Sequence, residues 1–333
     1  MATNILGSLP ELVKLLVSLT AGFSWRQREG SRGRPYVYQT KNIVNAFIVM
    51  VYFRLRSVRS LARFLVSHSY WAKACGFTEQ IPSYRTLSRR LVVLDKPAVC
   101  FANQVIQILL RYHLISIRII STDSSLCAAL GKVAHKNHPE KKATDPDARW
   151  GWSESRDWVF GYKLHLTSTV LLPGKTLAPL AWITTSANLH DSKLFLPLME
   201  RATALARRAR RRIKFSLGDK AYDINENYSF SLGNDFRLVT PVRRFKNRRE
   251  IAQKEWAKRF VDSPQGKAIY GRRADNERLF AQLKDLFLID PLPVKGQCKV
   301  ASYLSVVCLA YLLGILYNHL NGRSLRAIKS LAT

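Results

Sequence analysis

Residues 270–284 have the sequence YGRRADNERLFAQLK, which predicts a helix with a functional face. It contains no proline, and its single glycine falls in the first turn. At about 100° per residue, the side chains of Tyr270, Arg273, Glu277 and Lys284 share an arc of about 60°. One carboxylate beside two cations and a phenol suits a metal ligand next to groups that hold phosphate.

The other two faces of this helix are a core face and a solvent face. The expected core residues are Leu279, Phe280, Leu283, Leu286 and Phe287, and the expected solvent residues are Asp275, Arg278, Gln282 and Asp285. An ordinary ion pair between Arg273 and Glu277, worth about 0.2–0.5 kcal/mol on a surface helix, explains the charged face equally simply. Partner carboxylates elsewhere in the chain are what would favour a metal site.

The composition indicates a globular protein with a polyanionic partner. The chain has 333 residues, 47% of them hydrophobic, which is enough for one large domain or two smaller ones. Its 53 Lys and Arg residues against 23 Asp and Glu residues leave a net charge of +30, so we expect a nucleic acid as the partner. A ribosomal or purely architectural protein has similar charge, but such proteins are usually shorter and have fewer apolar segments.

Cysteine usage and the apolar segments predict a cytoplasmic protein without a membrane partner. The five cysteines include no C-x-x-C pair, which argues against a disulfide framework or a zinc site. The first residues, MATNILGSLPELVK, lack the pattern of a secretory signal. The apolar stretch 301–320 contains Ser, Tyr, Asn and His residues, so a buried helix is a better explanation than a membrane span.

Residues 1–113 are expected to form a helical DNA-binding region. Apolar stretches of helical length follow a basic segment at 22–38, and Pro82 and Ser83 mark the start of a helix over 81–94. That helix carries Arg85, Arg89 and Arg90. It resembles the second helix of a helix-turn-helix, which enters the DNA major groove. A basic, solvated face on a bundle helix explains the same pattern.

From residue 115 the pattern changes to strands. We expect strands at 115–121, 158–170, 177–185, 213–217 and 236–242, with a loop over 132–149 and a helix over 194–206. The first three strands are expected to form a meander. Asp123 then follows the first strand and Asp219 follows the fourth, although Asp123 taken alone is more simply a turn or helix-capping residue.

The segments around these strands carry further charged residues. Asp191 is most simply a helix cap, and His190 is better explained as a capping-region residue than as part of a site. The arginine run 207–212 suits a helix C-terminus and is equally able to hold phosphates. Arg243 and Arg244 begin a basic loop after the fifth strand, and we expect both to contact DNA.

The spacing Y-x-x-R-x-x-x-E-x-x-x-x-x-x-K, met by Tyr270, Arg273, Glu277 and Lys284, resembles the signature of bacterial insertion-sequence DDE transposases of the IS-four branch. The segment LGDKAYD around Asp219 is similar to the second-aspartate motif of that family, with Ala221 where glycine is more frequent. Members of the branch carry a long β-rich insertion before the glutamate. Only 57 residues separate Asp219 from Glu277 in this chain. It is therefore open whether the element is excised through a hairpin end, and whether the chain resembles a neighbouring insertion-sequence family instead.

The resemblance implies an α/β fold: a ribonuclease H-like, mixed five-stranded sheet with flanking helices, preceded by the α-helical N-terminal DNA-binding domain. The catalytic domain is expected at 114–322, followed by a C-terminal tail at 323–333. In this family, Asp123, Asp219 and Glu277 would hold Mg²⁺ or Mn²⁺, two ions per site, while Tyr270, Arg273 and Lys284 would hold the transposon strand.

The resemblance also implies a function. Water would cut the strand, and the freed 3′-hydroxyl would attack target DNA, with a homodimer holding two terminal inverted repeats. The alternatives are a transposase-derived DNA-binding protein that has lost cleavage and a ribonuclease H-like nuclease without strand transfer.

Overall fold

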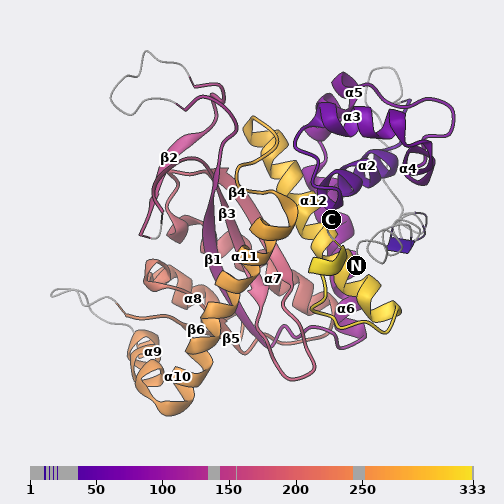
Figure 1. Cartoon of the computed structure of the whole chain (residues 1–333). Helices are drawn as coiled ribbons and strands as arrows, with labels where there is room; N and C mark the ends of the chain where they lie inside the picture. Colours follow the sequence, from indigo (N-terminus) through magenta and orange to yellow (C-terminus); the bar gives the residue numbers. More distant parts are fainter. Residues whose placement is uncertain are drawn as a thin grey trace, which may run out of the picture. The chain divides into compact units, whose positions relative to one another are not determined.

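The chain forms two compact units, and each is discontinuous in sequence. The computed structural model describes residues 37–133, 143–154, 156–242 and 252–331, with Glu11, Leu12, Leu15, Ser18 and Ala21 before them. The first unit comprises Met1–Val105, Cys127–Ala148 and Leu283–Thr333; the second comprises Ile106–Leu126 and Arg149–Gln282. These divisions differ from the expected boundaries at 113 and 322, because the C-terminal helix has its contacts with the N-terminal helices (Figure 1).

The first unit is helical. Its helices are α2 (Thr40–Tyr52), α3 (Val58–Ser67), α4 (Ser69–Ala74), α5 (Tyr84–Leu91), most of α6 (Asp95–Arg111) and α12 (Gln297–Leu320). Ser57 and Ser83 begin α3 and α5, each accepting the backbone N–H three residues ahead. The start of α5 therefore lies where Pro82 and Ser83 predict it. The residues of α6 are shared between the two units.

The helix α12 is the centre of the helical unit. By length and composition it is apolar enough to cross a membrane, but 94% of its most apolar window is buried inside the protein. Tyr52 of α2 donates its hydroxyl to the Ala310 carbonyl at 2.6 Å. The expected tail, 323–333, also packs here: Ile328 and Leu331 are buried and lie against Gly314, where an added Cβ would stand 3.1 Å from Ile328 Cδ1 and 3.4 Å from Leu331 Cδ1. The apolar stretch at 301–320 is thus a buried core helix.

The second unit is built on a six-stranded mixed sheet. Its strands are β1 (Ile119–Ala128), β2 (Arg149–Ser153), β3 (Asp157–Thr169), β4 (Pro179–Ser186), β5 (Phe215–Leu217) and β6 (Arg237–Val239). The order is β2-β3-β1-β5-β6, with β4 paired to β3; β3 is antiparallel to β2 and β4, whereas β1, β5 and β6 run parallel. The expected ribonuclease H-like α/β fold is confirmed, with six strands where five were expected.

Helices cover both faces of this sheet, and successive side chains of β5 point alternately to the two faces. Phe215 and Leu217 join a buried cluster with Val170 and Val239, against which α9 (Ala252–Asp262) and α10 (Pro264–Tyr270) pack. Ser216 faces the other way and donates to the Met199 sulfur of α7 (Phe195–Arg208). One further helix, α8 (Asn225–Gly233), connects β5 to β6.

The unexpected strand is β2. It pairs with the start of β3 through cross-strand aromatic residues, Trp150 opposite Phe160 and Trp152 opposite Trp158. β4 pairs with the rest of β3 on the same edge, and Gly151 lies so close to Ala187 that a Cβ would sit 2.5 Å from its carbonyl oxygen. Alternating tryptophans were therefore the sequence signal for this strand.

The helix expected over 270–284 is divided into three parts. α10 ends at Tyr270, the 3₁₀ turn η3 spans Gly271–Arg273, and α11 spans Ala274–Phe287. The predicted core face is confirmed, since all five of its apolar residues are buried. Asp275 was wrongly placed on the solvent face: it is 2% exposed, and its carboxylate accepts the Leu171 backbone N–H at 2.8 Å.

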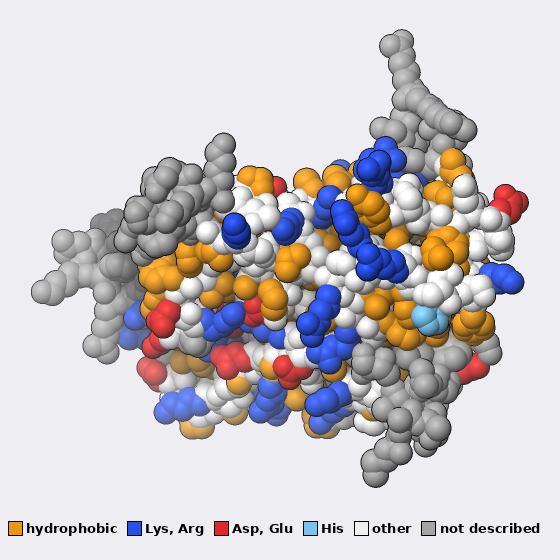
Figure 2. All heavy atoms as spheres, turned by 45° about the horizontal axis from the view of Figure 1, so that its top comes forward, with side chains coloured by type: hydrophobic (Ala, Val, Ile, Leu, Met, Phe, Trp, Pro, Cys, Tyr) orange, Lys and Arg blue, Asp and Glu red, His pale blue; other side chains and the backbone are white. Residues whose placement is uncertain are grey.

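Cationic side chains are prominent on the surface. On the face that Figure 2 shows, Lys and Arg side chains are spread among hydrophobic and neutral ones. All five cysteines are free, and three of them are buried.

Candidate active site

Asp123 lies within β1, not after its end as expected. The parallel pairing of β1 with β5 stops at Ser121 opposite Leu217, and β1 then continues alone on that edge. Asp123 is two residues beyond the last paired position. Its side chain is 18% exposed, and one of its oxygens accepts the Ser124 backbone N–H at 2.8 Å. The end of the pairing, and not the end of the strand, is what frees this side chain.

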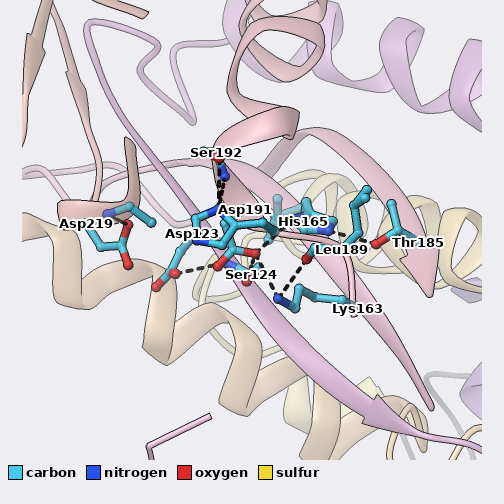
Figure 3. A network of polar contacts seen from close by, with 12 residues as sticks. Asp123, Ser124, Lys163, His165, Thr185, Leu189, Asp191, Ser192 and Asp219 are labelled. Carbon is cyan, nitrogen blue, oxygen red and sulfur yellow. Dashed lines mark hydrogen bonds and ion pairs between the residues drawn. The ribbon is translucent and has the colours of Figure 1, made fainter. Parts of the chain in front are cut away.

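Asp219 follows β5 by two residues, as the sequence predicts. Its side chain accepts the Ala221 N–H at 2.8 Å and so starts the 3₁₀ turn η2 (Lys220–Tyr222). Gly218 before it has no room for a side chain, because a Cβ would stand 2.8 Å from the Tyr222 ring. Because β1 and β5 are neighbours and parallel, both aspartates come to the same edge of the sheet, and Figure 3 shows their carboxylates directed into the same space.

Arg273 connects the first aspartate to the glutamate. Its Nη1 lies 3.4 Å from Asp123 Oδ2, and its Nη2 lies 3.0 Å from Glu277 Oε1. The side chain of Glu277 is 59% exposed. Tyr270 lies close enough to feel these charges, and burial raises its pKa while Arg273 lowers it. Asp123 of β1 is therefore brought together with Tyr270, Arg273 and Glu277, which come from the consecutive elements α10, η3 and α11 far away in sequence.

The carboxyl group of Asp123 is held in an unfavourable environment for a negative charge. Burial raises its pKa to about 7, against the lowering effects of the Ser124 N–H and Arg273, and the charges of Asp219 and Asp191 raise it further. A cation near Asp123 and Asp219 would relieve this repulsion.

The donors fit a hard divalent cation in chemical type, because Mg²⁺ and Mn²⁺ prefer carboxylate oxygens. In the part of the chain that the structure describes, however, no three His, Cys, Asp or Glu side chains stand close enough to hold a metal ion as they are. Glu277 forms an ion pair with Arg273 instead of grouping with the two aspartates. That ion pair is exposed on the glutamate side and of the i,i+4 kind, worth about 0.3–0.5 kcal/mol, so Glu277 is free to turn at little cost.

Asn276 is a site residue that the sequence analysis missed. It is completely buried, and its Nδ2 donates to the Ser121 carbonyl at 3.0 Å while its Oδ1 accepts from the Ser168 hydroxyl at 2.9 Å. These bonds fix α11 to β1 and β3 one residue before Glu277. The signal in the sequence was a polar residue adjacent to the apolar face of a core-facing helix.

A second missed feature is the ion pair of Lys163 and Asp191, at 3.1 Å (Figure 3). Asp191 is not the expected helix cap; its Oδ1 also accepts from the Ser124 hydroxyl at 2.9 Å. The cap is His190, as expected, whose ring accepts the Ser192 N–H. His165 lies 3.4 Å from the same oxygen of Asp191, but burial lowers its pKa to about 4, so Lys163 supplies the charge.

The remaining residues that were predicted to contact DNA differ in their surroundings. Lys284 belongs to the helical unit and lies 3.5 Å from Asp290 there. Arg85 and Arg89 are exposed on α5. Arg90 is only 6% exposed and donates to the Tyr38 carbonyl and the Thr40 hydroxyl, so its guanidinium holds the fold and does not face DNA in this structure. Arg243 and Arg244 lie outside the described residues.

Comparison with protein families gives two matches. Residues 117–313, more than half of the chain, match the model described as "Transposase DDE domain". Residues 5–91 match a second model, described as "Transposase domain (DUF772)". No curated protein matches the chain.

Solved structures give distant similarities. The piggyBac transposase synaptic complex with hairpin DNA has a TM-score of 0.43 at 9% identity, covering 99% of this chain and 76% of that one. The Mos1 transposase paired-end complex with the left transposon end has a TM-score of 0.24 at 12% identity, covering 91% and 84%. Both scores are below 0.5.

Proposed function

This chain belongs to the family of transposases with a DDE domain, and from that premise we propose that it cuts DNA at insertion-sequence ends and joins them to target DNA. The observation that carries the proposal is the bridge of Arg273 between Asp123 and Glu277, with Asp219 at the same sheet edge. We assign the chain to the IS-four branch or a close neighbour, on the spacing of Tyr270, Arg273, Glu277 and Lys284.

Asp123, Asp219 and Glu277 would hold the divalent cations, Mg²⁺ or Mn²⁺. Two bound cations would stabilise the attacking and leaving oxygens of an in-line displacement at phosphorus. The raised pKa of Asp123 supports this assignment, because a buried carboxylate near two other acids gains most from a nearby cation.

The other residues of the site would bind and orient the DNA strand. The Arg273 guanidinium, released from Glu277, would donate two parallel hydrogen bonds to a phosphate. Tyr270 is partly buried beside it, and Lys284 would contribute a point charge further along α11. Asn276 keeps α11 against β1, and with it the distance between Asp123 and Arg273.

The partners would be double-stranded DNA, as terminal inverted repeats and as target, bound by a homodimer in the cytoplasm. The net charge of +30 supports a DNA partner, and counterion release makes such binding fall steeply with salt. Arg85 and Arg89 on α5 are the exposed cations of the helical unit that we assign to DNA.

Substituting Asp219→Asn tests the proposal, with the exposed Asp262→Asn on α9 as the matched control. The substrate is a labelled duplex carrying the inverted repeat that flanks the gene. We expect Asp219→Asn to keep end binding and to lose strand cleavage and joining, while Asp262→Asn keeps all three. If the unsubstituted protein binds the end as tightly as Asp219→Asn and cleaves nothing, the DNA-binding alternative is favoured. If the unsubstituted protein cleaves the end but does not join it to target DNA, a nuclease is favoured.

A further inference from the structure

Two adjoining cavities lie in the sheet unit where β1 and β5 begin. Their volumes are about 430 and 460 Å³, and they share Arg211, Arg212, Ile213 and Asp235 in their lining. Cations dominate both: Arg207 and Arg210 line the first, and Arg118, Lys175 and Lys214 line the second. We call the pair the arginine cavities.

The cations come from several elements, so the end of a single helix does not account for them. Arg207 is in the last turn of α7, where a positive side chain favours the helix dipole. Arg118 precedes β1, Lys175 follows β3, and Lys214 precedes β5. The dipole of α7 explains only the first of these, while a common anionic ligand explains all of them.

Few of these charges are neutralised within the protein. The one acid in the two linings is Asp235. Arg207 donates to the Asn234 side chain at 2.9 Å, and Arg211 lies 3.5 Å from the His113 ring, so both bond to uncharged or weakly basic partners. Arg118, Arg210, Arg212 and Lys214 form no ion pair with another described residue. Like charges at this density repel unless an anion lies among them.

Arg210 adds a backbone observation. Its φ is +53°, in the left-handed region where α7 stops and the chain turns back, and the Arg211 N–H bonds to the Ala206 carbonyl across this turn. Glycine adopts this conformation without strain, whereas other residues lose about 1 kcal/mol or more. An arginine at such a position is a disadvantage for folding that a ligand contact would offset.

The arginine cavities are separate from the carboxylates. Arg118 precedes Asp123 by five residues along β1, which at about 3.3 Å per residue is roughly 17 Å. The strand-starting end of β1 and β5 is thus cationic and the opposite end acidic. A phosphate held by one end is not the phosphate cut at the other.

We propose that the arginine cavities bind the phosphate backbone of double-stranded DNA at a distance from the scissile bond. This inference rests on the proposed function, since it gives the same enzyme a second, non-catalytic DNA contact. Its recognition is by charge alone, because the lining offers cations to phosphates and nothing that distinguishes bases.

The test compares full-length variants that lose two positive charges each: Arg210→Gln with Arg212→Gln, and as control Arg326→Gln with Lys329→Gln, both exposed in the helical unit. The probe is a fluorescent duplex of arbitrary sequence, about 30 base pairs long, titrated between about 50 and 200 mM NaCl. Each phosphate contact contributes about 0.9 to the slope of log K against log salt, so we expect the cavity variant to lose about 1.8 and the control much less.

A second variant guards against misfolding. Arg210→Gly removes one cation but suits the positive φ, so we expect it to melt at a higher temperature than the unsubstituted protein while its salt slope falls by about 0.9. An unchanged slope in both cavity variants, or a loss as large in the control, overturns the proposal. Displacement of the duplex by millimolar inorganic phosphate at constant ionic strength also overturns it, because it would show a small-anion site.

The outcomes separate this inference from the proposed function. The cavity variants are expected to need more protein for half-maximal cleavage of a labelled end, whereas Asp219→Asn is expected to lose cleavage at every protein concentration. A failure of Asp219→Asn to abolish cleavage would reject the proposed catalytic site and leave the salt-slope result standing. A normal salt slope with Asp219-dependent cleavage would reject the arginine cavities alone.

Discussion

Arg273 Nη1 lies 3.4 Å from Asp123 Oδ2, although 150 positions separate the two residues in the chain. The guanidinium occupies the position in which a cation would stabilise both Asp123 and Glu277. It therefore supplies positive charge to the acids before any metal or phosphate binds.

Arg273→Gln should raise the affinity for Mn²⁺ in the absence of DNA. Removing a positive charge beside Asp123 and Glu277 increases their attraction for a cation, by at least threefold on the scale of a partly exposed pair. Binding is measured by electron paramagnetic resonance at about pH 8.5, so that Asp123 is ionised in both proteins. Cleavage should fall at least tenfold, because a phosphate contact is lost.

The matched control for this variant is Arg272→Gln. Arg272 is the exposed neighbour and donates to the Leu171 carbonyl. The same change of charge one residue away should leave Mn²⁺ affinity nearly unchanged. Equal affinities in all three proteins would show that Arg273 does not compete with a cation.

Asp123→Asn should stabilise the metal-free protein, and more at pH 8 than at pH 5. The pKa of Asp123 rises from 3.8 when unfolded to about 7 in the folded protein, so the folded state binds this proton more tightly. Ionisation between these values lowers the free energy of unfolding as pH rises, and asparagine has no such ionisation. Urea denaturation in EDTA at the two pH values measures the difference.

Two further measurements check this interpretation. Mn²⁺ at pH 8 should stabilise the unsubstituted protein and have little effect on Asp123→Asn. Asp262→Asn, on the surface, is the control variant for both measurements. A stabilisation by Asp123→Asn that is the same at pH 5 and pH 8 would contradict a raised pKa.

Lys163 and Asp191 should be energetically coupled. Asp191→Asn leaves Lys163, whose side chain is 12% exposed, without its anion, and Lys163→Met leaves Asp191 without its cation. Each should cost about 1–3 kcal/mol of unfolding free energy, and the double variant less than the sum. Ser124→Ala removes the hydrogen bond that the Ser124 hydroxyl of β1 donates to Asp191, so its cost can be measured separately from that of the ion pair. Additive effects in the double variant would mean that the two charges act independently.

Asn276→Ala should destabilise the sheet unit and reduce cleavage. It removes the partner of the Ser121 carbonyl and of the Ser168 hydroxyl, which are buried, at about 1–3 kcal/mol. Asn225→Ala, on the exposed side of α8, is the control. If thermal melting is unchanged in Asn276→Ala, then α11 is held against β1 by its apolar residues alone.

Sequence patterns predicted the parts of this protein that depend on local periodicity. The buried face of α11, the cap of α5 by Ser83 and the location of Asp219 after β5 all follow from rules that act within a few residues. The strand containing Asp123 was placed about four residues early, because isoleucines at 115, 117 and 119 alternate before hydrogen bonding to a neighbour begins.

What the sequence could not predict depends on partners distant in the chain. Asp275 looks like a surface residue until the Leu171 N–H that it accepts is known. Asp191 resembles a helix cap, and only the neighbouring β3 strand brings Lys163 to it. Whether the three acids hold metal together remains a prediction, which the experiments on Asp219 and Asp123 address.

The packing of α2 against α12 has a consequence for biosynthesis. Ten of the thirteen residues of α2 are buried, and its Tyr52 reaches Ala310, 258 positions later. A ribosome therefore has to release nearly the whole polypeptide before this unit closes. Prematurely terminated products that lack α12 would leave the apolar surface of α2 exposed.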